Sequence, residues 1–333
     1  MIITRTPFRI SFFGGGTDYP PWYREHGGAV ISTTIDKYCW ITCRELPPFF
    51  EHRSRVIYSQ IENVKRVEDI IHPSARECIR YIGIKEGLEI HHDGDLPART
   101  GLGSSSSFTV GLLHALSAHV GKMITKKQLA LESIHVEQDI IRENVGSQDQ
   151  VSVAFGGLNS ITFENDGSFR VDPIIMSSDR RQAIEGSLML FYTGVSRIAS
   201  DVAAEQIKNI PDKTKELHTI RQMANEGVKI LAGNSDIVEF GRLLHEGWML
   251  KKSLSKRITT PEIDNVYEQA RRAGAIGGKL LGAGGGGFFV LFVEPHNRQR
   301  VLEALKNYLY VPFKFENLGS QIAYYEPYSS ATK

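Results

Sequence analysis

The segment LPARTGLGSSSS, residues 96–107, stands between an alternating apolar and polar stretch at 88–93 (LEIHHD) and an apolar run from Phe108 to Val120. The alternation predicts a half-buried strand, and the apolar run predicts a helix. We therefore expect a loop over 96–107 that leads into a helix. Small residues let a backbone approach a ligand closely, and N–H groups at a helix N-terminus bind anions. Serine hydroxyls add hydrogen-bond donors and a ligand for Mg²⁺. The segment thus predicts a phosphate-binding loop.

Three other interpretations fit this loop less well. A flexible Gly/Ser linker is disfavoured, because a linker does not connect a strand tightly to a Phe- and Leu-rich helix. A Walker A loop requires a following GK[ST] motif, which this segment lacks. A dinucleotide fingerprint requires GxGxxG within a βαβ unit, whereas the chain has GxGxxS here and no suitable unit around it.

Further along the chain, a helix expected over about 126–143 places a carboxylate among apolar side chains. At about 100° per residue, one stripe of this helix is apolar. Glu137 falls in the middle of that stripe. A carboxylate that faces a core is costly unless it is paired or bound to a cation. Glu137 is therefore interpreted either as half of a structural salt bridge or as a metal ligand that faces the phosphate loop. The stripe consists of Leu129, Ala130, Ile134, Val136, Ile140 and Ile141.

A second acid, Asp149, follows twelve residues later in the motif GSQDQ, beyond a turn at Gly146. It is interpreted either as a neighbour of the Mg²⁺ ion or as a general base. Spacing alone leaves both roles open.

Two other glycine clusters lie near the ends of the chain. The segment KLLGAGGGGFF, residues 279–289, has five glycines in the six positions 282–287, which implies close approach of its backbone to a ligand or to another domain. In PFRISFFGGGTDY, residues 7–19, Arg9 and Asp18 flank a glycine turn. Asp18 is expected either to bind sugar hydroxyls or to stabilise the turn.

Composition excludes several classes of protein. The chain has 333 residues with 39 basic and 38 acidic side chains, so its net charge of +1 gives no sign of binding to nucleic acid or to an anionic membrane. No stretch approaches the roughly 18 consecutive apolar residues of a membrane span, and the N-terminal MIITRTPFRI is too polar for a signal peptide. The three cysteines, Cys39, Cys43 and Cys78, form no CxxC pair and are expected to be reduced. These features predict a cytoplasmic protein.

The order of the elements predicts an α+β fold. Strands are expected at 2–3, 10–13 and 29–43 and a hairpin at 160–172. Beyond residue 187 the sequence predicts a strand at 188–192, three long amphipathic helical stretches up to residue 274, a strand at 288–292, a helix and a last strand. Because strands and helices do not alternate regularly, we expect two α+β domains, at 1–180 and 181–333.

Taken in this order, three motifs resemble those of the GHMP kinases, the family of galactokinase, homoserine kinase, mevalonate kinase and phosphomevalonate kinase. They are Pro7-Phe8-Arg9 with Gly14 to Asp18, then Pro97 with Gly101 to Ser107, then Gly282-Ala283-Gly284 with Gly286-Gly287. The resemblance spans residues 5 to about 325. It implies an ATP-dependent kinase with an N-terminal domain like ribosomal protein S5 domain 2, a ferredoxin-like C-terminal domain, and ATP and a small-molecule acceptor meeting between them.

The resemblance also assigns roles to residues. Asp149 matches the acid beside the acceptor hydroxyl, and Arg9 the arginine that orients it; Ser105 and Glu137 match the Mg²⁺ ligands. The residues expected to bind ATP are Pro97, Gly101, Leu102, Gly103, Ser104, Ser105, Ser106 and Ser107. Those expected to bind the acceptor are Gly15, Gly16, Thr17, Asp18, Lys37, Arg197, Gly284 and Gly285.

Within the family, Gly15 and Gly16 stand where galactokinases carry Glu-His, which argues against galactose. The stretches RTPFRISFFGGGTDYPPW and HGGAVISTTIDKY resemble the branch that phosphorylates C1 of D-glycero-α-D-manno-heptose 7-phosphate, a step toward GDP-heptose for surface polysaccharide. A kinase for another sugar, such as fucose, and an inactive sugar-sensing regulator are the alternatives. Lys37, Arg99 and Arg197 are candidate ligands of the acceptor phosphate. The oligomeric state is left open.

Overall fold

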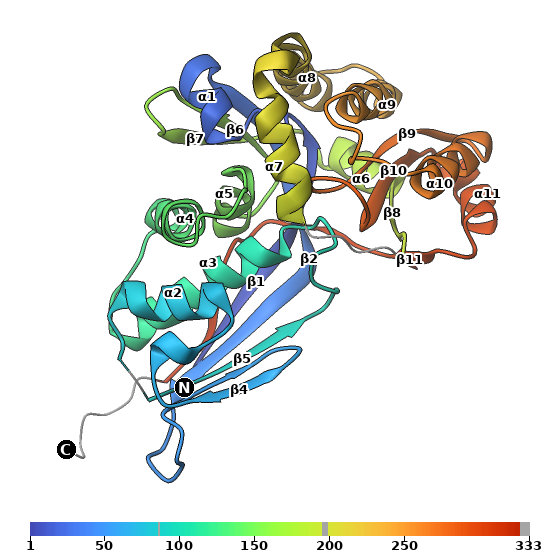
Figure 1. Cartoon of the computed structure of the whole chain (residues 1–333). Coiled ribbons are helices and arrows are strands. Elements are labelled where there is room, and N and C mark those ends of the chain that lie inside the picture. Colours follow the sequence, from blue (N-terminus) through green and yellow to red (C-terminus); the bar gives the residue numbers. More distant parts are fainter. Residues whose placement is uncertain (86, 195–198, 327–333) are drawn as a thin grey trace.

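A computed structural model of the chain describes residues 1–85, 87–194 and 199–326, and it contains two β-sheets with helices packed on them (Figure 1). The strands of the first sheet are β1 (Ile2–Phe13), β2 (Gly28–Glu45), β3 (Ser54–Ile57), β4 (Ile61–Val64), β5 (Leu88–Gly94), β6 (Asn159–Phe163), β7 (Phe169–Pro173), β12 (Phe315–Glu316) and β13 (Gln321–Tyr325). The strands of the second sheet are β8 (Leu188–Tyr192), β9 (Ala275–Leu280), β10 (Phe288–Val293) and β11 (Leu309–Val311).

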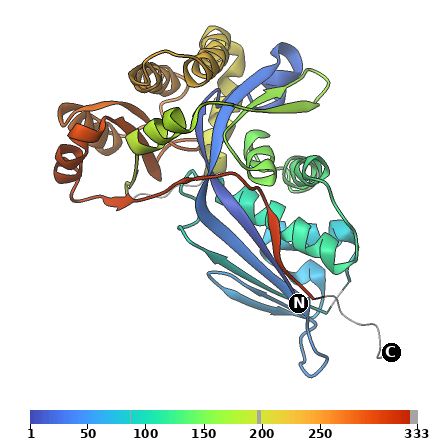
Figure 2. The same ribbon diagram turned by 180° about the vertical axis from the view of Figure 1, so that it is seen from behind.

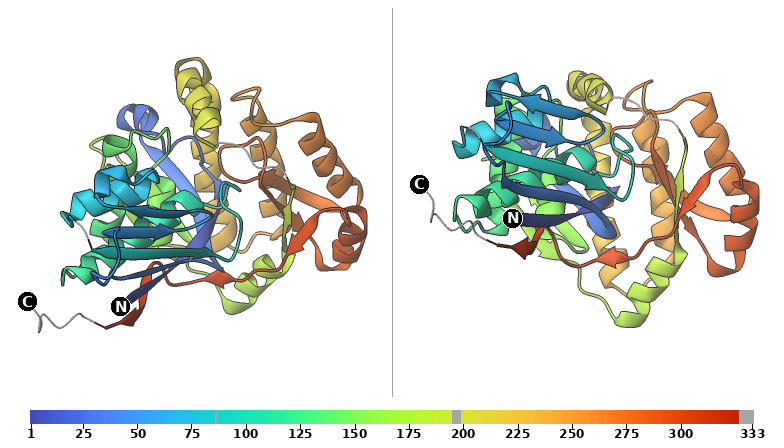
Figure 3. Two further views of the ribbon diagram at one scale, coloured as in Figure 1. Left: turned by 60° about the horizontal axis from the view of Figure 1, so that its bottom comes forward. Right: turned by 90° about the horizontal axis from the view of Figure 1, so that it is seen from below.

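The two sheets lie side by side (Figure 3). The first has the order β13-β1-β2-β5-β3-β4, while β6 and β12 also pair with β2, and β7 pairs with β6. Its pairs are antiparallel except for β3 with β5. The second sheet has the antiparallel order β11-β8-β10-β9. Two sheets with covering helices confirm the α+β prediction.

Helices pack on both sheets (Figure 1). Helix α3 packs across β1 and β2, and α2, α4 and α5 pack on α3. The α-helices are α1 (Pro20–His26), α2 (Pro73–Ile82), α3 (Ser104–His119), α4 (Lys126–His135), α5 (Gln148–Phe155), α6 (Ser178–Ser187), α7 (Ala199–Asn209), α8 (Thr214–Ala232), α9 (Val238–Lys252), α10 (Pro261–Arg272) and α11 (Arg298–Ala304). Short 3-10 turns are η1 (Val67–Asp69), η3 (Ile210–Lys213) and η4 (Pro295–Asn297), and a π-helix is η2 (Val136–Ile140).

The phosphate-loop prediction needs one correction at its end. Helix α3 begins at Ser104, so the four serines form its first turn rather than the end of the loop. Gly103 precedes them with φ +75°, a conformation that glycine adopts without strain. The serines therefore present backbone N–H groups and hydroxyls from a helix N-terminus.

Two helical predictions also change in detail. The helix expected over 126–143 is regular only to His135 and continues as the π-helix η2, which contains Glu137. Short π-helical turns occur often at functional sites. Among the described residues, the three helical stretches expected between 192 and 274 are four α-helices, α7 to α10. The 3-10 turn η3 lies between α7 and α8, and Pro261 stands at the start of α10.

The end of the chain returns to the first sheet. β12 pairs with β2, and β13 pairs with β1 along its outer edge (Figure 2). Apart from β12 and β13, every strand of the first sheet comes before residue 180 and every strand of the second sheet comes after it. The division into domains 1–180 and 181–333 stays a prediction, and β12 and β13 belong to the second range but pair in the first sheet.

The structure bears on two further expectations. Within the described ranges, no helix is both long and apolar enough to cross a bilayer. The thiols of Cys39, Cys43 and Cys78 are buried and free.

Candidate active site

A bidentate ion pair joins the first strand to the N-terminus of α5. Arg9 of β1 donates from Nε to Oδ1 of Asp149 at 2.8 Å and from Nη2 to Oδ2 at 2.7 Å. Its Nη1 donates to the Gly101 carbonyl at 2.5 Å. The Arg9 side chain is 3% exposed and that of Asp149 is 24% exposed. The guanidinium therefore fixes the carboxylate against the phosphate loop and leaves part of it accessible to a ligand.

The phosphate loop is shaped by close backbone contacts. Gly101 and Gly103 have φ of +84° and +75°. A Cβ on Gly101 would lie 2.4 Å from the Leu281 carbonyl, and one on Gly103 would lie 3.1 Å from Cγ of Arg9 and 3.5 Å from Oδ2 of Asp149. Only glycine fits such positions. The loop thus contacts both Asp149 and the glycine-rich segment before β10.

The first turn of α3 is available for an anion. No side chain in the described part of the chain caps it, because its N-cap is Gly103. Backbone N–H groups at such an end carry partial positive charge and bind phosphate. Within the loop, the Pro97 carbonyl accepts from the hydroxyl of Thr100 at 2.7 Å, and the Leu102 carbonyl accepts from the backbone of Arg9 at 3.0 Å.

The four serines have different surroundings. Ser104 Oγ accepts from the backbone N–H of Arg99 at 3.1 Å, and Ser107 Oγ donates to the Pro7 carbonyl at 3.1 Å. Ser106 is buried and donates to Glu137 Oε2 at 2.9 Å, whereas Ser105 is exposed. The structure therefore brings Glu137 to Ser106, next to the Ser105 expected from the family resemblance, and leaves Ser105 exposed.

Glu137 is wholly buried, as its place in the apolar stripe predicts. Its Oε2 also accepts from the side chain of Gln150, but its Oε1 is buried with no hydrogen-bond partner among the described residues. Burial, assisted by the nearby charge of Glu143, raises its pKa to about 7. No basic side chain in the described ranges pairs with Glu137, so the salt-bridge interpretation is not supported.

A carboxylate oxygen without a partner, next to a phosphate loop, fits a hard cation such as Mg²⁺. Within the described residues, no group of three or more His, Cys, Asp or Glu side chains is arranged to hold a metal. Mg²⁺ commonly takes one or two protein ligands and completes its shell with water and substrate phosphates. Glu137 and Ser105 are compatible with that pattern.

The carboxyl of Glu137 makes the stability of the Mg²⁺-free protein depend on pH. Its pKa is about 7 in the folded chain against an ordinary 4.5, so between these values the folded chain binds more protons than the unfolded chain. The free energy of unfolding should therefore fall by about 3 kcal/mol as pH rises from 4.5 to 7. Denaturant titrations in chelator at pH 5, 6 and 7 measure this. Glu137→Gln should lose this part of the slope, and an unchanged slope contradicts the assignment.

The turn Gly14–Asp18 lies against the start of α5. Asp18 is 2% exposed, its Oδ1 accepts from the backbone of Gly16 at 2.9 Å, and its Oδ2 accepts from the backbone of Gln148 at 3.3 Å. Burial raises its pKa, and the charge of Asp149 adds to that effect. The structure thus places Asp18 beside Asp149 while both of its oxygens also support the turn.

The neighbours of Asp18 in this turn differ in their contacts. The Thr17 hydroxyl donates to the Gly14 carbonyl at 2.8 Å and accepts from the backbone of Ala29 at 3.1 Å, and the residue is fully buried. These contacts close the turn, and the expected role of Thr17 in acceptor binding stays a prediction. Gly15 faces polar side chains, and Gly16 faces two leucines.

The glycine segment 279–289 packs against the phosphate loop. The backbone of Phe288 donates to the Thr100 carbonyl at 3.1 Å, and a Cβ on Gly282 would lie 2.5 Å from the Cα of Gly101. Gly284 and Gly285 instead pack on Ile258, whose carbonyl accepts from the backbone of Gly285 at 2.9 Å. Their expected contact with the acceptor stays a prediction.

The candidate ligands for an acceptor phosphate are dispersed. Lys37 pairs with its neighbour Asp36 at 3.3 Å. Arg99 is exposed on the phosphate loop with φ +61°. Burial raises the pKa of the nearby Glu143, and the charge of Arg99 opposes that effect. Arg197 lies outside the described residues. A contact of any of these three residues with the acceptor phosphate stays a prediction.

Sequence analysis did not single out two buried lysines next to this site. Lys251, at the end of α9, donates to two carbonyls at the start of the glycine segment, at 3.1 and 2.5 Å. Lys279, in β9, donates to the Phe12 carbonyl of β1 at 2.9 Å. Burial and the charge of Arg9 lower the pKa of Lys251 to about 7, and burial also lowers the pKa of Lys279. A signal for Lys279 was present, because it interrupts the apolar strand before the glycines.

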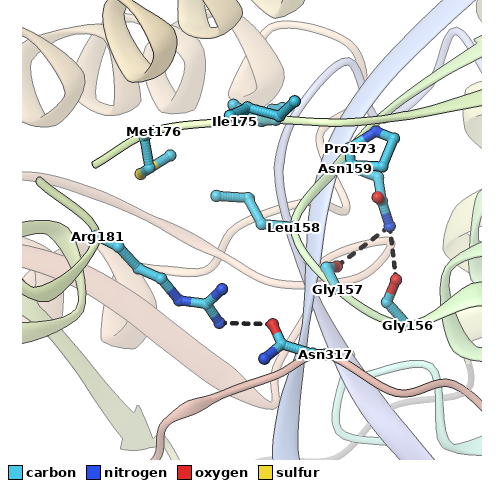
Figure 4. A pocket seen from close by; sticks show the side chains of 10 residues that line it. Gly156, Gly157, Leu158, Asn159, Pro173, Ile175, Met176, Arg181 and Asn317 are labelled. Carbon is cyan, nitrogen blue, oxygen red and sulfur yellow. Dashed lines mark hydrogen bonds between the residues drawn. The ribbon is translucent and has the colours of Figure 1, made fainter. Parts of the chain in front are cut away.

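A cavity of about 340 Å³ lies away from these residues, between the β6–β7 hairpin, the start of α6 and the segment before β13 (Figure 4). Arg181 lines it, but its guanidinium already binds Glu185 at 2.9 Å and Asn317 at 2.8 Å. None of the predicted site residues lines this cavity. The Arg9–Asp149 pair therefore remains the candidate active site.

Comparison with known proteins identifies the family of the chain. Residues 69–157 match the N terminal domain of GHMP kinases and residues 228–311 match the GHMP kinases C terminal, which together make up more than half of the chain. The D-glycero-alpha-D-manno-heptose 7-phosphate kinase of Campylobacter jejuni is 26% identical over 92% of this chain and 93% of its own. A galactokinase of Pyrococcus furiosus is 26% identical over 92% of this chain and 94% of its own.

Among solved structures, a D-glycero-D-manno-heptose 1-phosphate kinase from Bacteriodes thetaiotaomicron superposes with a TM-score of 0.80 at 25% identity, over 99% of this chain and 100% of that one. The match covers both sheets and the segment that returns to the first of them. The chain therefore belongs to the GHMP kinase family and is an ATP-dependent sugar kinase.

Proposed function

We propose that the protein transfers the γ-phosphoryl group of ATP to the anomeric C1 hydroxyl of D-glycero-α-D-manno-heptose 7-phosphate, giving the 1,7-bisphosphate. The observation that carries this proposal is the Asp149 carboxylate, held by Arg9 against the carbonyl of Gly101 in the phosphate loop. An acceptor hydroxyl at Asp149 is thereby next to phosphates bound at α3. The names of two similar heptose kinases support a heptose as the acceptor.

Phosphoryl transfer requires mainly that the protein position ATP and the acceptor and neutralise the charge of the phosphates. The acceptor oxygen forms a bond to the γ-phosphorus, the bond from that phosphorus to the bridging oxygen of ADP breaks, and the hydroxyl proton passes to Asp149. Arg9 holds the carboxylate in place by two hydrogen bonds. The N–H groups of the first turn of α3 bind the phosphate oxygens.

Ser105 and Glu137 would hold Mg²⁺, which neutralises the charge of the ATP phosphates when bound. Gln150 connects Glu137 to Asp149, because it follows Asp149 in α5 and its side chain donates to Glu137. Ser106 and Gln150 therefore keep the Glu137 carboxylate oriented toward the loop.

The glycine turn supports a bulky acceptor. Gly15 leaves space next to Gln148 and Ser11 that the first residue of a Glu-His pair would fill, whereas a Cβ at Gly16 would lie 3.2 Å from Leu217. A heptose carrying a phosphate also needs a counter-charge away from ATP. Lys37 and Arg197 remain the proposed ligands, whereas the position of Arg99 favours a contact with ATP.

A panel of sugars assayed with ATP and Mg²⁺ tests the proposal. A charge-assisted hydrogen bond to phosphate is worth about 1.5–3 kcal/mol, so kcat/KM for heptose 7-phosphate should exceed that for unphosphorylated heptose by roughly 10–150-fold. The KM for ATP should stay nearly constant across the panel. A higher kcat/KM for fucose or another free sugar would replace the heptose assignment, and no turnover of any sugar would favour an inactive regulator.

A further inference from the structure

Beside the Arg9–Asp149 pair, the absent side chain of Gly15 leaves an opening about the size of one methyl group between its backbone and two polar side chains. A Cβ at Gly15 would lie 3.6 Å from Nε2 of Gln148 and 3.8 Å from Oγ of Ser11. Both Oε1 of Gln148 and Oγ of Ser11 are buried with no hydrogen-bond partner in the described ranges. Native proteins satisfy nearly all buried polar groups, so two unsatisfied atoms on the two side chains that face Gly15 call for a ligand.

The opening is next to the reacting centre on two sides. Gln148 directly precedes Asp149 in the first turn of α5, and its backbone N–H donates to Asp18 Oδ2 at 3.3 Å. Ser11 lies two residues after Arg9 in β1, so both side chains project from the same face of the strand. A ligand hydroxyl in this opening is therefore a near neighbour of the hydroxyl that meets Asp149.

We propose that Gln148, together with Ser11, determines specificity by binding the C2 hydroxyl of the sugar, adjacent to the anomeric hydroxyl held at Asp149. The inference rests on the proposed function, because it takes a sugar with its C1 hydroxyl at Asp149 as the acceptor. The amide of Gln148 both donates and accepts, and the serine hydroxyl does the same, so together they match a sugar hydroxyl. Neither residue exchanges a proton with the reacting atoms.

The consequence is discrimination against sugars that lack this hydroxyl. A site built around a hydroxyl rejects an analogue without it, because buried polar groups are then left unpaired. The wild-type protein should therefore prefer the acceptor over its 2-deoxy analogue by about 10–100-fold in kcat/KM. KM for ATP should be equal with the two sugars.

The test combines variants with these two sugars. Gln148→Met keeps the length of the side chain and removes its hydrogen bonds, and Ser11→Ala removes the hydroxyl. Each should lower kcat/KM for the parent sugar and bring its ratio to the 2-deoxy sugar toward one, with KM for ATP unchanged. Gln128→Met in α4, where the amide donates to Glu132, is the matched control and should keep the wild-type ratio.

The outcomes separate this inference from the proposed function. If wild-type protein gives no product with heptose 7-phosphate, the proposed function fails, and this inference is overturned with it. If wild-type protein turns the sugar over but Gln148→Met and Ser11→Ala keep the full preference, or lower both rates by the same factor, only this inference is overturned. Thermal unfolding of each variant identifies a loss of activity that comes from misfolding. If Gln148→Met is unfolded, the sugar preference of Ser11→Ala tests the inference.

Discussion

Replacing Asp149 by asparagine should lower kcat by about 10²–10⁴-fold, the usual range for loss of a general base. Asparagine keeps the size of the side chain but cannot take the acceptor proton, and its amide nitrogen faces a guanidinium that donates from both Nε and Nη2. Because ATP is proposed to bind at the N-terminus of α3 rather than at Asp149, KM for ATP should change little. Steady-state kinetics in both substrates measure the two effects separately.

A matched control is available in η2. Asp139→Asn removes a carboxylate that is 65% exposed and pairs with His135, so its kcat should equal that of the wild type. Near-normal turnover of Asp149→Asn would leave Asp149 a structural residue. A loss of less than about tenfold would instead assign it to positioning the hydroxyl, without proton transfer.

The second large effect is on the Mg²⁺ requirement. Loss of a partner that merely orients a metal ligand costs about 10–100-fold in affinity, and Glu137→Gln removes a direct ligand, so half-maximal activity should need about 100-fold more Mg²⁺. The variant should fold, since glutamine retains the shape and still accepts from Ser106 and Gln150.

A Mg²⁺ titration at fixed ATP makes this measurement. Glu132→Gln in α4 serves as control, because its carboxylate binds Lys122 and Gln128 away from the phosphate loop. A Glu137→Gln titration that coincides with the wild-type curve would remove Glu137 from the metal site.

The parts of the site that could be predicted from the sequence depend on local patterns. The phosphate loop is marked by consecutive small residues before an apolar run, and the burial of Glu137 follows from helical periodicity. The hairpin formed by β6 and β7 follows from alternation around Asp166-Gly167. Each of these signals lies within about twenty residues of chain.

The parts that could not be predicted depend on contacts between distant segments. The strands β12 and β13 pair with β2 and β1 across roughly 280 to 320 residues of sequence, and nothing in their composition specifies that partner. Lys251 is buried because α9 packs on β9, and its place in the sequence gives no sign of that contact.

The direction in which each serine of α3 points could not be predicted either, because it depends on the rotation along the helix. Successive residues of α3 point about 100° apart, so Ser105, Ser106 and Ser107 face solvent, Glu137 and the Pro7 carbonyl respectively. A run of four serines cannot show which of them meets the acid. The opening at Gly15 was missed for a related reason, because Ser11 and Gln148 are 137 residues apart and meet only in the fold.

Identifying the product is the most direct test of the proposed phosphorylation at C1. The protein should be incubated with ATP, Mg²⁺ and D-glycero-α-D-manno-heptose 7-phosphate, and the product examined by ³¹P NMR with coupling to the sugar protons. We expect one new phosphate resonance coupled to the anomeric proton, with the C7 phosphate unchanged, and a rate roughly 10–150-fold above that for unphosphorylated heptose. A product phosphorylated at any other carbon, or equal rates on the two sugars, would contradict the account.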